Sequence, residues 1–341
     1  MNKEYRLKIL FFILPFLDVI TALLTRNTDL KFTPGIIFKS ILLLYFVIYI
    51  IKSRSKYKKL AVISLIFMLL YLIFYIYSKF DIINDSFILN EMINLFKLIY
   101  FPICFIGLLC YFDDNNVPKK CITDIFKFSL ILYVLLLIIP IIFGISYTTY
   151  PEILKGYVGL FYAGNEIANI LIILFPFSYL FINKTKYSFL IIFPIILVMM
   201  MIGTKVATFG CLIITLITFI FSIFKNKFKI NNFVIKCLSI FVFALILSLD
   251  SYAVYNYNYI KNNVYNDESK EIQGNLNIFY DKNKITKIIR PLVSGRDMLL
   301  ANTISIYNDL DNDSNIWFGI GFSNTERVNN TNVARLIEID I

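Results

Sequence analysis

The chain has 341 residues, of which 58% are hydrophobic and 16% are charged, and its formal net charge is +10. Soluble domains carry about 25% charged residues, so this composition excludes a soluble enzyme, a disordered chain and a secreted disulfide scaffold. The sequence contains no histidine, which removes His-based acid–base catalysis and most zinc or haem sites. These values predict a polytopic membrane protein.

The charge is distributed unevenly along the chain. Residues 1–249 hold 24 Lys or Arg and 11 Asp or Glu, a net charge of +13, whereas residues 250–341 hold 9 and 12, a net charge of −3. We therefore expect a transmembrane helical domain over 1–249 and an extracytoplasmic loop region over 250–341. The basic excess lies in the membrane part, where it sets orientation, so no nucleic-acid partner is expected.

Long apolar runs predict the membrane spans, because a helix needs about 20 mainly apolar residues to cross the bilayer core. Nine runs qualify, at 7–24, 36–51, 60–77, 95–111, 125–143, 165–182, 188–202, 206–224 and 233–249. The first run resembles a signal peptide, but it contains Pro15 and Asp18 and lacks a small-residue cleavage site, which favours a retained anchor. The expected fold is an all-α polytopic helical bundle of about nine spans.

Basic residues between the runs predict the orientation. With the N-terminus inside, the inner segments hold fifteen Lys or Arg and the short outer segments hold five. The N-terminus is therefore predicted to be cytoplasmic, and nine spans then place residues 250–341 outside a bacterial plasma membrane.

Charged residues in or beside the spans map to the outer half of the predicted bundle. They are Asp18, Lys39, Lys97, Glu166 and Lys205. A charge near the membrane centre costs about 2.5–3.5 kcal/mol on insertion scales, so each one needs a reason. Lys39 and Lys97 have the ordinary alternative of extending to the interface.

The starts of two runs carry polar residues suited to binding. Asn165 and Asn169 lie four apart and share one helix face, although Asn165 is equally suited to be a helix N-cap. Gly203 is expected to end one helix, Thr204 to cap the next, and Lys205 to fall in its first turn. A helix N-terminus attracts anions, and a lysine there adds a full positive charge.

Five cysteines lie in apolar runs or short loops, and none forms a C-x-x-C pair. We interpret them as small buried hydrophobic residues, and predict neither disulfides nor a metal cluster.

The polar tail contains a predicted capped helix. Ser294 and Asp297 fit a capping box that opens an amphipathic helix running to about Leu310, with Gly295 and Arg296 in its opening turn. Arg296 is thus a second cation on a helix start.

Two further tail patterns are not typical of ligand sites. Asp309, Asp311 and Asp313 imitate a calcium loop, but Ser314 replaces its glycine and Ile320 its bidentate Glu. A solvated turn is expected, with a D-x-D metal site as the alternative. Gly319-Ile320-Gly321 lacks the third glycine and the strand–helix setting of a dinucleotide site.

Together these segments resemble the O-antigen ligase/polymerase family of bacterial surface-polysaccharide enzymes. The resemblance lies in Leu14–Asp18 with Pro34-Gly35, Gly164–Asn169, Gly203-Thr204-Lys205, and Ser294-Gly295-Arg296 followed by Gly319-Ile320-Gly321. It implies a GT-C-like membrane glycosyltransferase that transfers a glycan from undecaprenyl pyrophosphate to an acceptor glycan outside the membrane, for capsule or another surface polysaccharide. It also implies basic residues near the pyrophosphate and no cofactor or metal.

By position, the resemblance gives catalytic roles to Arg296 and to Lys205, where the family commonly has Arg. Ligases of the family place a catalytic His in the outer loop, so its absence favours a polymerase. Glu166 and Glu338 are candidate bases, and Glu166 is the one assigned. The expected substrate-binding residues are Asn165, Asn169, Ser294, Gly295, Asp18 and Lys97.

Two other functions stay open from the sequence. One is a lipid-linked oligosaccharide flippase or a transporter, although no internal repeat is seen. The other is an inactive truncated relative, because family members continue beyond the outer loop with further spans.

Overall fold

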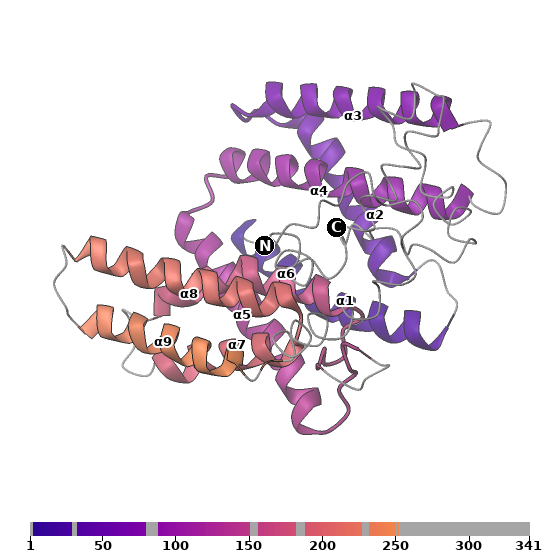
Figure 1. Ribbon diagram of the computed structural model, residues 1–341. Helices are drawn as coiled ribbons and strands as arrows, with labels where there is room; N and C mark the ends of the chain where they lie inside the picture. The colour runs from indigo at the N-terminus through magenta and orange to yellow at the C-terminus, as the bar shows by residue number, and fades with distance from the viewer. Residues whose placement is uncertain are drawn as a thin grey trace, which may run out of the picture. The chain divides into compact units, whose positions relative to one another are not determined.

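A computed structural model describes residues 3–28, 33–79, 88–150, 156–181, 188–226, 232–249 and 251 (Figure 1). These residues form nine α-helices and one 3-10 helix, with no β-strand among them. The elements are α1 (Lys3–Asn27), α2 (Pro34–Lys52), α3 (Lys58–Lys79), α4 (Ile88–Asp114), α5 (Lys119–Ile142), α6 (Gly164–Leu174), η2 (Phe175–Phe181), α7 (Ser188–Ile202), α8 (Lys205–Lys225) and α9 (Asn232–Leu249).

Eight of the nine apolar runs each coincide with one α-helix, but the helices are not equally long. Seven helices among the described residues are long and apolar enough to cross a membrane, and α6 and α7 are shorter. The expected single helix over 165–182 is instead α6 followed by η2. Pro176, the second residue of η2, favours this change, because its ring has no N–H to donate and clashes with the carbonyl four residues earlier, although four other prolines lie inside continuous helices. The described part is an all-helical, polytopic bundle.

The helices belong to two compact units. The first contains α1, α5, α6, η2, α7, α8 and α9, and the second contains α2, α3 and α4. The predicted boundary at residue 249 stays a prediction, because residues 252–341 lie outside the described residues.

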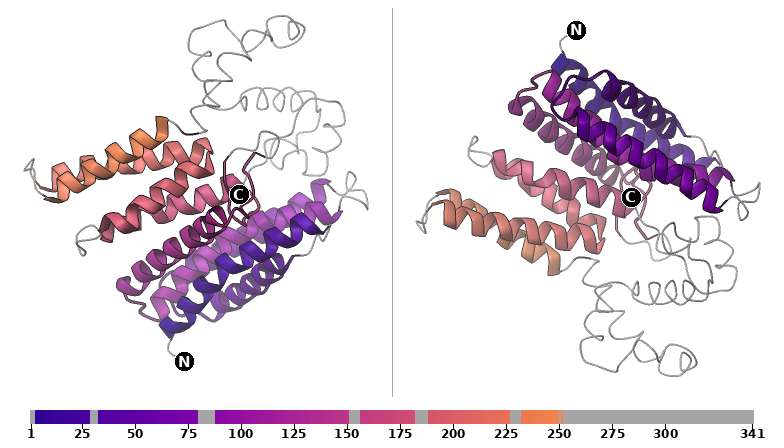
Figure 2. Two further views of the ribbon diagram at one scale, coloured as in Figure 1. Left: turned by 90° about the horizontal axis from the view of Figure 1, so that it is seen from below. Right: turned by 90° about the horizontal axis from the view of Figure 1, so that it is seen from above.

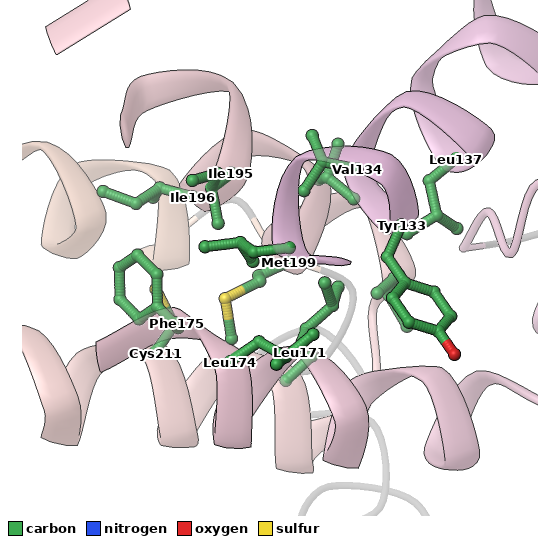
Figure 3. Close-up of a cluster of buried hydrophobic side chains, with 14 of the residues drawn as sticks. Tyr133, Val134, Leu137, Leu171, Leu174, Phe175, Ile195, Ile196, Met199 and Cys211 are labelled. Atoms are coloured by element: carbon green, nitrogen blue, oxygen red, sulfur yellow. The ribbon is translucent and has the colours of Figure 1, made fainter. Parts of the chain in front are cut away.

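The core of the first unit lies between α5, α6, α7, α8 and α9. Figure 3 shows Met199 of α7 among Leu171 and Leu174 of α6 and Val134 of α5. Small residues let the helices approach closely, as is usual in membranes: a side chain at Gly210 of α8 would collide with Ile172 of α6. The α8 and α9 helices pack along each other, as both views of Figure 2 show. All five cysteines are buried and unpaired, which confirms their interpretation as small apolar residues.

The second unit contains a polar cluster where α4 ends against the α2–α3 connection. The Asp114 carboxylate accepts hydrogen bonds from Ser53 Oγ at 2.6 Å and Tyr49 OH at 3.1 Å. Asp113 accepts from Ser55 Oγ at 2.8 Å and forms an ion pair with Lys56 at 3.5 Å. These bonds hold the end of α4 against the end of α2 and the start of α3. Further along, Phe46 of α2 packs against Gly107 of α4.

We expect Asp114→Ala to lower the free energy of unfolding by about 1–3 kcal/mol, because buried Ser53 and half-buried Tyr49 lose their shared acceptor. Asp114→Asn keeps one acceptor oxygen and should cost less. Thermal unfolding of the purified protein in detergent measures both. Equal stability of the two variants and the unaltered protein would show that this cluster does not hold the unit together.

Candidate functional site

Two helices of the first unit start side by side. A Cβ at Gly164, the first residue of α6, would lie 3.2 Å from Cγ2 of Thr204, which caps α8. Because Gly210 of α8 lies against Ile172 of α6, the two helices leave this end in the same direction. We call residues 164–167 and 204–208 the paired helix start. The positive ends of both helix dipoles therefore face one small region.

The start of α8 follows the sequence prediction. Gly203 has a φ of +74°, an angle that glycine adopts easily and other residues rarely adopt. This angle ends α7 at Ile202. Thr204 is extended, and its Oγ1 accepts a hydrogen bond from Ala207 N at 3.2 Å. Lys205 is the first helical residue and is half-buried. The predicted break, cap and first-turn lysine are confirmed.

The start of α6 corrects one alternative. Its N-cap is Ala163, with extended backbone angles of −126° and 134°, and Asn165 is the second helical residue. The reading of Asn165 as an N-cap is therefore wrong, because the backbone N–H of Ile167 already closes the first turn on the Ala163 carbonyl, at 3.3 Å. Glu166 is exposed on the same turn, where a carboxylate is favourable to the helix dipole.

Asn165 and Asn169 both lie on α6, four residues apart as expected. Asn165 is half-buried at the paired helix start, and Asn169 is exposed one turn further along. Either amide can donate to and accept from sugar hydroxyls.

The connection between α5 and α6 is bound against the end of α7. Thr149 Oγ1 donates to the Ile202 carbonyl at 2.7 Å, and Tyr157 N donates to the Met201 carbonyl at 2.9 Å. An isolated antiparallel bridge joins Tyr147 to Gly159 within the connection. These bonds place Tyr147 and its neighbours next to the break at Gly203 and thus next to the paired helix start.

Arg26, in the last turn of α1, is a further cation near this region, and the sequence predicts no site role for it. Its Nη2 donates to the carbonyls of Phe161 at 2.9 Å and Tyr162 at 2.8 Å, directly before α6. The guanidinium carbon lies 3.9 Å from the centre of the Tyr147 ring. Among the described residues no carboxylate forms an ion pair with it, and its Nε is buried without a hydrogen-bond partner. A cation with no carboxylate partner in the described part of the chain therefore lies beside the start of α6.

Only the fold reveals this position. The bonds of Arg26 join residues 135 and 136 apart in the chain, and a basic residue in a last helical turn is common for purely local reasons. Tyr147 and Tyr162, in the predicted outer connection, could each bind a cation through the ring face. The sequence does not say which of the basic residues that cation is.

Arg26→Ala should lower the free energy of unfolding by about 3 kcal/mol, because it removes two charge-assisted hydrogen bonds and a cation–π contact. Arg26→Lys keeps the charge but not the planar fork, so it should recover only part of this loss. Arg6→Ala, an exposed arginine at the other end of α1, is the control and should be neutral in the same thermal unfolding assay. A neutral Arg26→Ala would mean that α1 is held to the α5–α6 connection by other contacts.

Asp18 is stabilised inside the first unit by a partner on α5. The hydroxyl of Tyr133 donates to its Oδ2 at 2.9 Å, which meets part of the cost of a polar group in an apolar helix. Lys39 and Lys97 belong to α2 and α4 of the second unit, where Lys39 is half-buried and Lys97 is exposed. Substrate roles for these three residues stay predictions.

The tail residues lie outside the described residues. These are Ser294, Gly295 and Arg296 with their predicted amphipathic helix, the Gly319–Gly321 turn, the Asp309–Asp313 triplet and Glu338. Their predicted roles are neither confirmed nor contradicted. In the described part of the chain, no three Cys, Asp or Glu side chains lie close enough together to hold a metal ion.

The fold and the site define a multi-pass membrane protein whose helix starts and basic side chains meet at one end of a bundle, an arrangement suited to an anionic group. A family model described as "O-antigen ligase like membrane protein" matches residues 2–341, and the chain belongs to this family. Membership indicates an enzyme of the glycosyltransferase type that acts on surface polysaccharide and lipid-linked glycan at the membrane. A search of curated proteins and a search of solved structures each found no match.

Proposed function

We propose that the protein transfers or polymerises oligosaccharide units carried on undecaprenyl pyrophosphate, at the outer face of the plasma membrane, for capsule or another surface polysaccharide. The observation that carries this proposal is the paired helix start with Lys205 on one helix and Arg26 beside the other. A pyrophosphate is negatively charged, so the positive ends of the two helices at the paired helix start attract it. In a lipid-linked glycan the pyrophosphate lies at the membrane surface, where the membrane helices end.

The reaction needs positive charge where the leaving group departs. An acceptor hydroxyl oxygen bonds to the anomeric carbon while the bond from that carbon to the phosphate oxygen breaks, and its electron pair stays on the lipid pyrophosphate. Lys205, at the start of α8, stabilises this growing negative charge, with the two helix dipoles assisting. Arg26 supports the region by holding α1 against the residues that open α6.

The remaining roles rest on the family resemblance. Arg296, from the tail, joins Lys205 at the pyrophosphate, and Ser294 and Gly295 shape its helix start. Glu166 takes the proton of the attacking hydroxyl, and its exposed position on the first turn of α6 supports contact with an acceptor. Because the chain contains no histidine, the polymerase reaction is favoured over that of a His-dependent ligase.

The orientation of the first unit supports an outer-face reaction. Lys8 of α1 and Lys119 and Lys120 of α5 lie near the starts of these helices, while Arg26 ends α1 beside the start of α6. The basic end is therefore the one away from the paired helix start, and basic segments are cytoplasmic in most membrane proteins. This distribution of basic residues supports an outer position for Lys205.

Supplying the purified protein with undecaprenyl-pyrophosphate repeat units tests the proposal. Glycans of increasing length on a gel are the expected result, and Lys205→Ala is the matched sample in which lengthening should be slowed. Sealed vesicles carrying the protein separate the alternatives. Units that cross the bilayer without lengthening would identify a flippase, and units that neither lengthen nor cross would identify an inactive relative.

A further inference from the structure

A groove lies between α1 and α5 at the end of the first unit away from the paired helix start. It has a volume of about 410 Å³, within the range of about 300–1,000 Å³ typical of small-molecule sites. Its walls are apolar and include Ile9, Phe12, Ile125 and Phe128. The rings of Phe12 and Phe128 stack with their centres 5.6 Å apart, and both side chains are exposed. The groove therefore reaches the surface of two helices that are long and apolar enough to cross the membrane.

Polar side chains border the same groove. Lys8 and Tyr5 contribute from α1, and Asp124 and Ser129 contribute from α5. An apolar wall edged by an ammonium, a carboxylate and hydroxyl groups matches an amphipathic ligand. In a membrane such a ligand is a lipid, with a chain along the aromatic wall and a headgroup at Lys8.

The charge around the groove selects the kind of headgroup. The first turns of α1 and the first three turns of α5 carry six cations and two carboxylates, namely Lys3, Arg6, Lys8, Lys119, Lys120 and Lys127 against Glu4 and Asp124. Basic sites between helices near the cytoplasmic face attract anionic headgroups, with about 1 kcal/mol per cation near the surface. The excess of positive charge favours an anionic lipid over a zwitterionic one.

Asp124 further restricts the kind of lipid headgroup that fits the groove. A carboxylate lining the groove repels a bare phosphate but accepts hydrogen bonds from hydroxyl groups. A headgroup that carries both a phosphate and free hydroxyls satisfies Lys8 and Asp124 together. Phosphatidylglycerol is a phospholipid with this combination.

We propose that the α1–α5 groove is a binding site for phosphatidylglycerol. The phosphate lies beside Lys8, the headgroup glycerol donates to Asp124, and one acyl chain lies against Phe12 and Phe128. The site is separate from the glycan reaction and does not depend on it.

Tryptophan quenching by brominated lipids tests the site in the full chain. The sequence has one tryptophan, Trp317, so Phe12→Trp in a Trp317→Phe background reports on the groove alone. The protein is reconstituted in phosphatidylcholine vesicles that contain an equal fraction of bromo-acyl phosphatidylglycerol or of bromo-acyl phosphatidylcholine. We expect roughly fivefold enrichment of phosphatidylglycerol around the introduced indole, corresponding to one cation at the headgroup. Ile213→Trp, exposed on α8, should show no preference.

Two charge variants distinguish binding in the groove from general attraction to the basic end of the first unit. Lys8→Gln should remove the preference, whereas Lys119→Gln removes the same charge outside the groove lining and should leave it. Equal quenching by the two lipids, or equal effects of the two variants, would overturn the proposal. If Phe12→Trp does not fold, native mass spectrometry decides with wild-type protein. Wild type should retain phosphatidylglycerol and Lys8→Gln should not, and a wild type that retains none would refute the site.

Discussion

Lys205→Ala is expected to slow glycan lengthening by about 10- to 150-fold, which corresponds to the loss of one charge-assisted hydrogen bond of about 1.5–3 kcal/mol. Lys205 opens α8 at the paired helix start, where its charge adds to two helix dipoles. The loss should fall mainly on kcat, because the charge on the leaving pyrophosphate grows in the transition state. Lys205→Arg should keep activity, since a guanidinium also donates to phosphate.

Lys58→Ala is the matched control. Lys58 is the first residue of α3, as Lys205 is of α8, but it belongs to the second unit and follows a predicted cytoplasmic connection. Its removal should leave the rate of lengthening unchanged. A Lys205→Ala protein as active as Lys58→Ala would return Lys205 to the role of a lysine that extends to the interface.

Arg296→Ala is expected to have the larger effect, a loss of about 10²- to 10⁴-fold in the rate of lengthening. A guanidinium can form two parallel charge-assisted bonds with a phosphate, whereas an ammonium acts as a point charge. Arg296→Lys should therefore give an intermediate rate. Membrane insertion, followed by fractionation, should be unaltered in both variants.

Arg290→Ala provides the control for Arg296, because it removes an equal charge from the same tail six residues earlier. It should leave lengthening intact. Normal polymer length in Arg296→Ala would remove this residue from the mechanism.

The two cations are expected to act on one pyrophosphate, so their effects should not be additive. The double variant should lose less than the product of the two single losses, as occurs when residues share a partner. Cysteines placed at 205 and 296 should be joined by a short bifunctional maleimide; the five native cysteines are all buried. Labelling from opposite sides of the membrane would end the proposal that Lys205 and Arg296 converge.

Local physics explains why the helix positions were predictable. Runs of apolar residues mark helices because a backbone in lipid must satisfy its own hydrogen bonds, and eight of the nine runs each coincide with one α-helix. Gly203 ends a helix through its own backbone angle, and Thr204 caps the next one through its own hydroxyl group. Both roles are local, so the sequence predicts them. At Asn165 the sequence allowed either a binding role or a helix N-cap, and the structure places the N-cap at Ala163 instead. The run 165–182 is divided next to Pro176, which has no backbone N–H to donate.

The sequence by itself determined the membrane class, the helix positions, the expected orientation and the family, because composition, period and short motifs act over a few turns. Only the tertiary structure decided that α6 and α8 start together, that Arg26 binds the residues before α6, and that Tyr133 supports Asp18. The physical reason is sequence separation: Arg26 and Phe161 are 135 residues apart. Which distant side chains meet depends on how whole helix surfaces pack, and a single sequence carries no local sign of that packing.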